Sequence, residues 1–196
     1  MRGGSSEMKP DRLCAFTDGV VAIIITIMVL ELPVPHEPGL AALRPSLVLF
    51  AAYALSFVKV GIYWSSHHHL LCAAQRVDGR VLIANLFLLF WLSLVPFVVR
   101  WVGEAGVTRD TVVAFGVLML LCALSMAWLR STLLAANDKG SPLHKATARG
   151  RKGQITLASY VVAIPIALLS PGTAIVIYVL VAALWLIPDK RFEQID

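Results

Sequence analysis

Ionisable side chains stand inside strongly apolar stretches of this sequence. Asp18 opens an apolar run that ends at Leu32, and the consecutive histidines His67, His68 and His69 close another. An unpaired carboxylate or imidazole at membrane depth costs several kcal/mol, so each of these groups is expected to have a partner. The arrangements to consider are a hydrogen-bonded cluster, a proton-coupling group and a metal site.

The first arrangement joins the two apolar runs. We expect Asp18, the Arg12 guanidinium and one of His67 or His68 to form a hydrogen-bonded cluster, with Trp64 packed against it. The alternative is that the histidines lie in the headgroup zone of a membrane and need no such partner.

A metal centre is not expected from the histidines. Adjacent residues on a helix diverge by about 100°, so three consecutive histidines cannot all reach one ion. The cysteines Cys14, Cys72 and Cys122 have neither metal nor disulfide spacing and are interpreted as small core residues. No nucleophile and base pair stands out, so the sequence predicts neither an enzyme nor a cofactor.

Composition places these groups in a membrane protein. Hydrophobic residues make up 58% of the 196 residues and charged residues 15%, and the mean hydropathy of +0.78 is too high for a soluble domain. The net charge of +5 does not indicate a nucleic acid partner, because the basic residues lie between the apolar runs. The sequence therefore predicts an all-α integral membrane protein.

The first membrane span is predicted over residues 16–32. It contains only two charges, Asp18 and Glu31, and its length suits a helix that crosses about 30 Å of hydrocarbon. A secretory signal is not expected, because an acidic residue opens the run and no small-residue cleavage site follows it.

Five further spans are predicted, which makes six in a single domain over residues 1–196. Their approximate ranges are 46–72, 81–99, 111–134, 154–169 and 173–187. Residues 33–39 hold three prolines and a glycine and are predicted as a loop. Residues 135–153 form the longest and most basic connection, whereas Ser170, Pro171 and Gly172 leave room only for a tight hairpin between the last two spans.

The distribution of Lys and Arg predicts the orientation in a cell membrane. Thirteen of them lie in the termini and in the loops after the second and fourth spans, and three lie on the opposite side. Both termini are therefore expected in the cytoplasm. The basic cluster at 149–152 is read as part of this signal, and binding of lipid headgroups is its alternative.

Lys59 falls at mid-depth in the second span. It could pair with Glu31, extend outward to the membrane surface, or lie in a wet interior where its charge affects conduction. The sequence does not distinguish these three placements.

The first span carries a narrow aliphatic stripe. Its members, with Thr26 beside them, recur at helical spacings of three and four: Phe16, Val20, Ile23, Ile27 and Leu30. Ordinary helix packing explains most such stripes. The alternative is a pore wall, in which several copies of the span present rings of Ile23, Ile27 and Leu30 to a common axis and gate it by dewetting.

Three motifs resemble prokaryotic members of the transmembrane protein 175 family, potassium channels related to the endolysosomal channel of animals. The positions of the first-span pattern correspond here to Arg12, Phe16, Thr17, Asp18, Gly19, Ala22, Ile23, Thr26, Val29, Leu30, Glu31 and Leu32. The second matches at Ile62, Tyr63, Trp64, His67 and His68, and the third matches closely from Asn85 through Pro96 to Phe97. The resemblance is strong in the first half, and later spans match mainly in number and hydrophobicity.

This resemblance implies a potassium-selective channel whose pore is lined by the first helix of a homotetramer, since each animal subunit carries two six-span repeats and dimerises. It implies a constriction at Ile23, further rings at Ile27 and Leu30, and a contribution of the Thr26 hydroxyl to selectivity. The Thr-Val-Gly-Tyr-Gly filter motif does not occur in the sequence.

The family's polar motif would hold the pore helix in place without touching ions. Its residues correspond here to Arg12, Phe16, Thr17, Asp18, Trp64, His67 or His68, and Asn85. Two features depart from the family pattern: Thr17 replaces the usual serine, and Lys59 has no counterpart. The alternative function is a proton-coupled or small-solute transporter that uses Asp18 and the histidines, but the sequence shows no pair of broken helices in corresponding halves.

Overall fold

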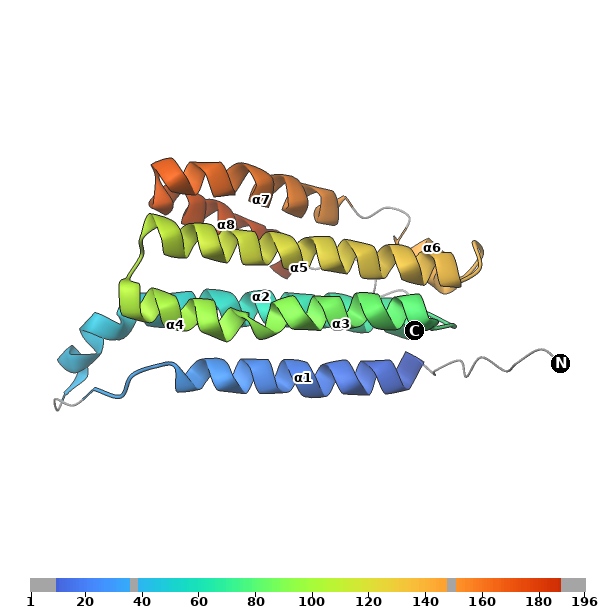
Figure 1. Ribbon diagram of the computed structural model, residues 1–196, viewed down its shortest axis with the longest axis horizontal. Coiled ribbons are helices and arrows are strands. Elements are labelled where there is room, and N and C mark those ends of the chain that lie inside the picture. Colours follow the sequence, from blue (N-terminus) through green and yellow to red (C-terminus); the bar gives the residue numbers. More distant parts are fainter. Residues whose placement is uncertain (1–9, 36–38, 148–150, 188–196) are drawn as a thin grey trace.

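The structure is a computed structural model that describes residues 10–35, 39–147 and 151–187. These ranges form an elongated bundle of nearly parallel and antiparallel helices without strands (Figure 1). The predicted all-helical class is therefore confirmed. The described residues exclude several that enter the orientation argument: Arg2, Lys9, Arg149, Lys190 and Arg191.

The first two spans match their predicted positions closely. Helix α1 (Pro10–Leu30) begins six residues earlier than predicted, and α2 (Leu47–Cys72) follows a short 3-10 helix, η1 (Leu40–Ser46). The early start of α1 brings Cys14 onto the same helix as Asp18.

The third span consists of two helices. Helix α3 (Gly79–Ser93) stops at Leu94, and α4 (Val95–Ala105) continues in nearly the same direction (Figure 1). Pro96 explains the break, because it has no N–H for the carbonyl four residues before it and its ring crowds that carbonyl. Gly106 ends α4 with a φ of 73°, a conformation that favours glycine.

The remaining spans also lie near their predicted ranges. Helix α5 (Arg109–Ala136) begins with a capping box in which Thr108 and Thr111 each bond the other's backbone. Helices α7 (Lys152–Leu169) and α8 (Pro171–Leu186) form the expected hairpin around Ser170. The connection predicted as a loop contains one further short helix, α6 (Pro142–Thr147), which a proline opens at its first position.

Five helical stretches are long and apolar enough to cross a membrane by length and composition. They are Pro10–Leu30, Leu40–Cys72, Gly79–Ala105, Arg109–Ala136 and Lys152–Leu169. The sixth predicted span corresponds to α8, an apolar helix of only 16 residues. The chain is therefore a multi-pass membrane protein, and the number six remains a prediction.

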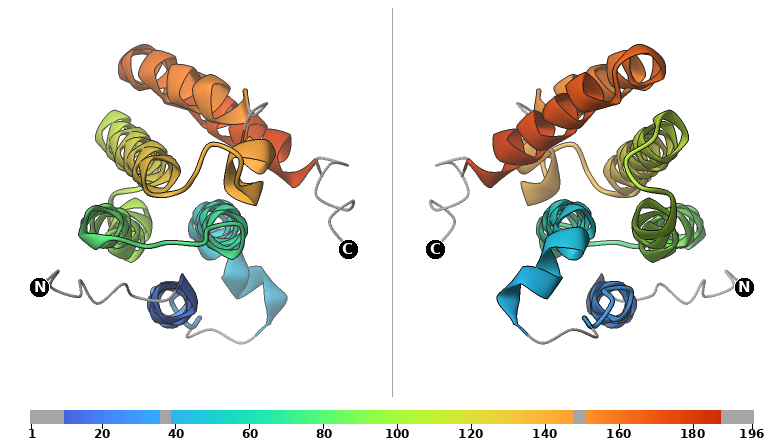
Figure 2. Two further views of the ribbon diagram at one scale, coloured as in Figure 1. Left: turned by 90° about the vertical axis from the view of Figure 1, so that its right-hand side faces the viewer. Right: turned by 90° about the vertical axis from the view of Figure 1, so that its left-hand side faces the viewer.

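The helices pack in layers, as the end-on views show (Figure 2). Helix α1 lies at one edge and contacts α2, α3 and α4; α5 packs on α3 and on α7; and α7 pairs with α8 at the opposite edge. Large apolar side chains such as Phe50, Phe90 and Leu168 are exposed on the outside. This distribution suits a protein whose surface contacts lipid.

A close approach between α5 and α8 generates a stability prediction. A Cβ added at Gly116 would lie 2.9 Å from Tyr178 Cζ, and the Tyr178 ring is held by contacts with Phe115 and Tyr160 and by its hydroxyl, which donates to Val112 O. We expect Gly116→Ala to lower the free energy of unfolding by about 1–3 kcal/mol, as overpacked cores do. Thermal melting in detergent measures this change.

Gly61→Ala is the matched control, because a Cβ at Gly61 in α2 meets no atom within 4 Å. The added helix propensity should leave that variant at least as stable as the parent. Equal melting temperatures for Gly116→Ala and the parent would contradict the packing described.

Candidate functional site

Helix α1 has a face inside the protomer and a face outside it. The inward residues are buried: Leu13, Thr17, Val21, Ile24 and Met28. The predicted aliphatic stripe lies on the other side, where Ile23 is 58% exposed, Ile27 41% and Leu30 78%, with Phe16 also exposed and Val20 half-buried. Packing within the protomer does not bury the stripe, so it can contact a neighbouring chain or lipid.

Thr26 lies beside this stripe and is also exposed. Its hydroxyl donates to Ala22 O and Ile23 O on its own helix, both at 3.0 Å. Because the proton is directed at the helix backbone, the oxygen lone pairs are left on the outer side.

A buried polar cluster joins α1, α2 and α3 at one level. Asn85 Nδ2 donates to Thr17 Oγ1 at 3.0 Å, and Asn85 Oδ1 lies 2.7 Å from His67 Nε2. An amide oxygen only accepts, so His67 carries its proton on Nε2. All three residues are at most 1% exposed. Buried bonds of this kind fix the rotation of a helix, since any other rotation leaves polar groups unpaired.

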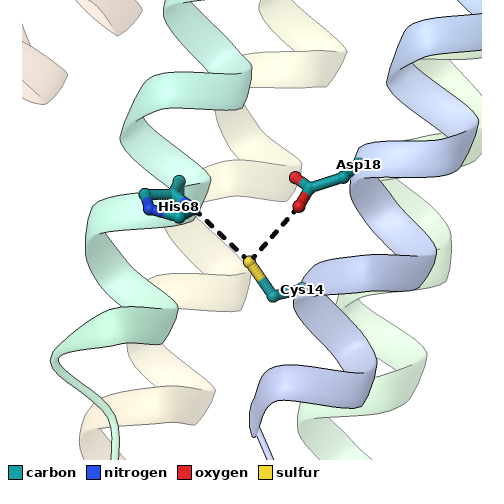
Figure 3. A group of neighbouring side chains, drawn as sticks. All are labelled: Cys14, Asp18 and His68. Carbon is teal, nitrogen blue, oxygen red and sulfur yellow. Dashed lines mark hydrogen bonds between the residues drawn. The ribbon is translucent and has the colours of Figure 1, made fainter.

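A second polar cluster lies nearer the surface between α1 and α2. Trp64 Nε1 donates to Asp18 Oδ1 at 2.8 Å, and the Cys14 thiol donates to Asp18 Oδ2 at 3.8 Å. Cys14 Sγ also lies 3.5 Å from His68 Nδ1, so the three side chains converge between the two helices (Figure 3).

These contacts divide the expected polar motif. Neither His67 nor His68 hydrogen-bonds to Asp18, and within the described ranges no ion pair joins Arg12 to Asp18. Arg12 and Phe16 are exposed instead. The single cluster expected from the sequence is therefore two clusters, and the Trp64 indole donates a hydrogen bond in one of them.

Lys59 pairs with a residue that the sequence did not suggest. Its side chain is 2% exposed, and Nζ donates to Tyr160 Oη on α7 at 2.9 Å. Glu31 instead lies 3.9 Å from Arg100 Nε. Lys59 borders a cleft of about 980 Å³ between α2, α5 and α7, on the side of α2 away from α1.

Sequence reasoning missed Cys14 and Tyr160. The spacing of four residues between Cys14 and Asp18 would have placed both on one helix face, had the helix been expected to start before residue 16. No local pattern marks Tyr160 as the partner of a residue 101 positions earlier.

Comparison with known proteins identifies similar channels. A family model described as endosomal/lysosomal potassium channel TMEM175 matches residues 12–96. A potassium channel of Chryseobacterium sp. (strain P1-3) is 44% identical over 187 residues, covering 95% of this chain and 97% of the relative. A potassium channel of Streptomyces collinus (strain DSM 40733 / Tue 365) is 37% identical over 100 residues, which cover 47% of each chain.

A solved structure extends the similarity to the fold. The crystal structure of a lysosomal potassium-selective channel TMEM175 homolog from Chamaesiphon minutus superposes with a TM-score of 0.76 at 26% identity. The superposition covers 90% of this chain and 96% of that chain. The likeness therefore includes the later helices as well as residues 12–96.

The buried cluster predicts a difference between two substitutions at one position. Thr17→Val keeps the shape of the side chain but removes the acceptor of Asn85 Nδ2, which should cost about 1–3 kcal/mol. Thr17→Ser keeps the hydroxyl and loses one buried methyl, which should cost about 1 kcal/mol or less. Thermal melting of both variants in detergent should give a lower melting temperature for Thr17→Val than for Thr17→Ser. The reverse order would show that packing at Thr17 outweighs its hydrogen bond.

Proposed function

This chain belongs to the TMEM175 family of potassium channels, and from that premise we propose that four copies surround one pore whose narrowest part is formed by α1. Potassium passes down its gradient between the α1 helices, without a cofactor and without a chemical reaction. The observation that carries the proposal is the exposed aliphatic stripe on α1, together with whole-length similarity to a protein named a potassium channel.

The position of α1 supports its role as the pore helix. It lies at the edge of the protomer (Figure 2), so four copies could bring their α1 helices to a common axis. Rings of Ile23, Ile27 and Leu30 would then project toward that axis. An exposed aliphatic face could also contact lipid. The family assignment favours the pore over that alternative.

The chemistry of the constriction follows from its side chains. A narrow aliphatic ring offers no oxygen to replace the water around an ion, so passage requires partial dehydration. Potassium gives up water more readily than sodium, which favours potassium to a modest degree. Next to Ile23 and Ile27, the outward lone pairs of Thr26 would supply the nearest side-chain oxygens.

The two polar clusters would hold α1 without contacting the permeating potassium. Thr17, Asn85 and His67 are buried and hydrogen-bonded to one another, and Asp18 accepts a hydrogen bond from Trp64. Groups with these partners serve as positioning residues. A transporter that used Asp18 and the histidines for proton coupling would have to break these bonds in each cycle.

Orientation completes the proposal. The excess of Lys and Arg in the termini and in the loops after α2 and α5 supports a location in the cell membrane with both termini in the cytoplasm. The clusters around Thr17 and Asp18 then lie toward the cytoplasmic end of α1, and Leu30 lies toward the outer end.

Ile23→Ala tests the constriction. The smaller side chain widens the ring, so potassium flux into proteoliposomes should rise several-fold and the preference for potassium over sodium should fall. Ile24→Val is the matched control, because Ile24 is the next residue but is 3% exposed inside the protomer. Its flux and selectivity should equal those of the parent. If both Ile23→Ala and its control match the parent, Ile23 is not at the constriction.

The assembly is tested by its mass. Native mass spectrometry of the protein in mild detergent should give four chains of 21.3 kDa each, because a pore lined by one helix per chain needs several copies around an axis. A monomer or dimer that retains potassium flux after reconstitution would contradict the four-fold pore.

A further inference from the structure

The Cys14, Asp18 and His68 cluster has the composition of a metal site. Cys14 and Asp18 stand one helical turn apart on α1, and His68 faces them from α2 (Figure 3). We propose that these three side chains bind a zinc-class divalent cation through Cys14 Sγ, one Asp18 carboxylate oxygen and His68 Nδ1. The expectation of no metal site considers the histidines and the cysteines separately, whereas here one residue of each type joins Asp18.

The separations between the ligand atoms fit a tetrahedral ion. Bonds of about 2.3 Å to sulfur and about 2.0–2.1 Å to nitrogen or oxygen place tetrahedral ligand atoms about 3.3–3.6 Å apart. Cys14 Sγ lies 3.5 Å from His68 Nδ1 and 3.8 Å from Asp18 Oδ2. All three ligand atoms lie within 4.8 Å of one another. Small side-chain adjustments would therefore complete three corners of the tetrahedron.

Neighbouring groups already orient two of the ligands. Trp64 Nε1 donates to Asp18 Oδ1. Asp18 Oδ2 accepts only the long bond from the Cys14 thiol, so it becomes available to the ion once that thiol loses its proton. Cys72 Sγ lies 3.4 Å from His68 Nε2, and the His68 ring stacks on Trp64 with centroids 5.9 Å apart. A proton on Nε2 directed at this sulfur leaves the Nδ1 lone pair free to bind the ion. Such outer contacts are typical of histidine metal ligands.

Charge and access also suit a zinc-class ion. Binding of the ion displaces the Cys14 thiol proton to solvent. The resulting thiolate and the Asp18 carboxylate neutralise a dication, so the complex carries little net charge beside an apolar interior. Sulfur and imidazole nitrogen select zinc or cadmium over magnesium and calcium, which prefer oxygen. All three side chains are partly exposed, which leaves an approach for the ion and a fourth position for water.

The bound ion would connect α1 to α2 one residue away from the buried Thr17 cluster. Its binding does not depend on the proposed pore, because both helices belong to one protomer. A failure of the metal site therefore leaves the channel proposal untouched, and the reverse also holds.

Titration of the purified protein in detergent tests the site. Zinc in the calorimeter should bind with one ion per chain, and cadmium should produce the ultraviolet charge-transfer band of a metal–thiolate bond. Cys14→Ser, which preserves size and hydrogen bonding, should remove the band and weaken zinc binding at least tenfold. His68→Gln should weaken binding similarly while it keeps the band at high cadmium. Magnesium should not bind.

His69→Gln is the matched control, since His69 is the neighbouring histidine but is not among the cluster ligands. It should bind zinc like the parent. Size-exclusion chromatography confirms that each variant remains folded. Absence of zinc binding at micromolar concentration in the parent overturns the proposal, and so does a cadmium band that survives in Cys14→Ser.

Discussion

The hydrogen bonds that join Thr17, Asn85 and His67 fix the rotation of α1, and the rest of the proposed pore depends on that rotation. In a membrane, an apolar helix face gains little by exchanging lipid for protein, so aliphatic contacts alone select a rotation weakly. Buried polar groups are more selective, because each unsatisfied one is costly. With Thr17 turned toward Asn85, Ile23 points about 120° away around the helix. The inward bonds thereby determine which side chains face outward.

The same logic separates the two polar clusters. The inner cluster is at most 1% exposed, joins its three side chains by hydrogen bonds and contains no carboxylate. The outer one contains the Asp18 carboxylate, which needs stronger partners and finds the Trp64 indole N–H. Placing the charged group at the partly exposed level lowers its desolvation cost. Helix α1 therefore carries an uncharged buried cluster at Thr17 and a partly exposed cluster at Asp18.

Much of this arrangement could be predicted from the sequence, because hydrophobic length and proline positions are local signals. The helices lie close to their predicted ranges, and the break at Leu94 reflects Pro96. The partners of polar groups were harder to predict, because they depend on how the helices rotate against one another. Depth in the membrane suggests Arg12 and a histidine as partners of Asp18 and leaves Trp64 as a packing residue, whereas the Trp64 indole donates the hydrogen bond to Asp18. Lys59 reaches Tyr160 across 101 residues, a pairing that depends on how α7 packs on α5. The hydrophobic periodicity of the sequence likewise does not show which helix faces meet between the subunits of an assembly.

The unequal lengths of the helices have a consequence for the surrounding membrane. Helix α5 has 28 residues and spans about 42 Å, whereas α8 has 16 and spans about 24 Å. If α8 is the predicted sixth span, hydrocarbon about 30 Å thick has to become thinner beside it, or the lipid headgroups have to move inward at its ends. The cost is a fraction of a kcal/mol per Å and falls on one side of each protomer only. Bilayers with shorter acyl chains would relieve it, so lipid thickness is a variable to which this fold is inherently sensitive.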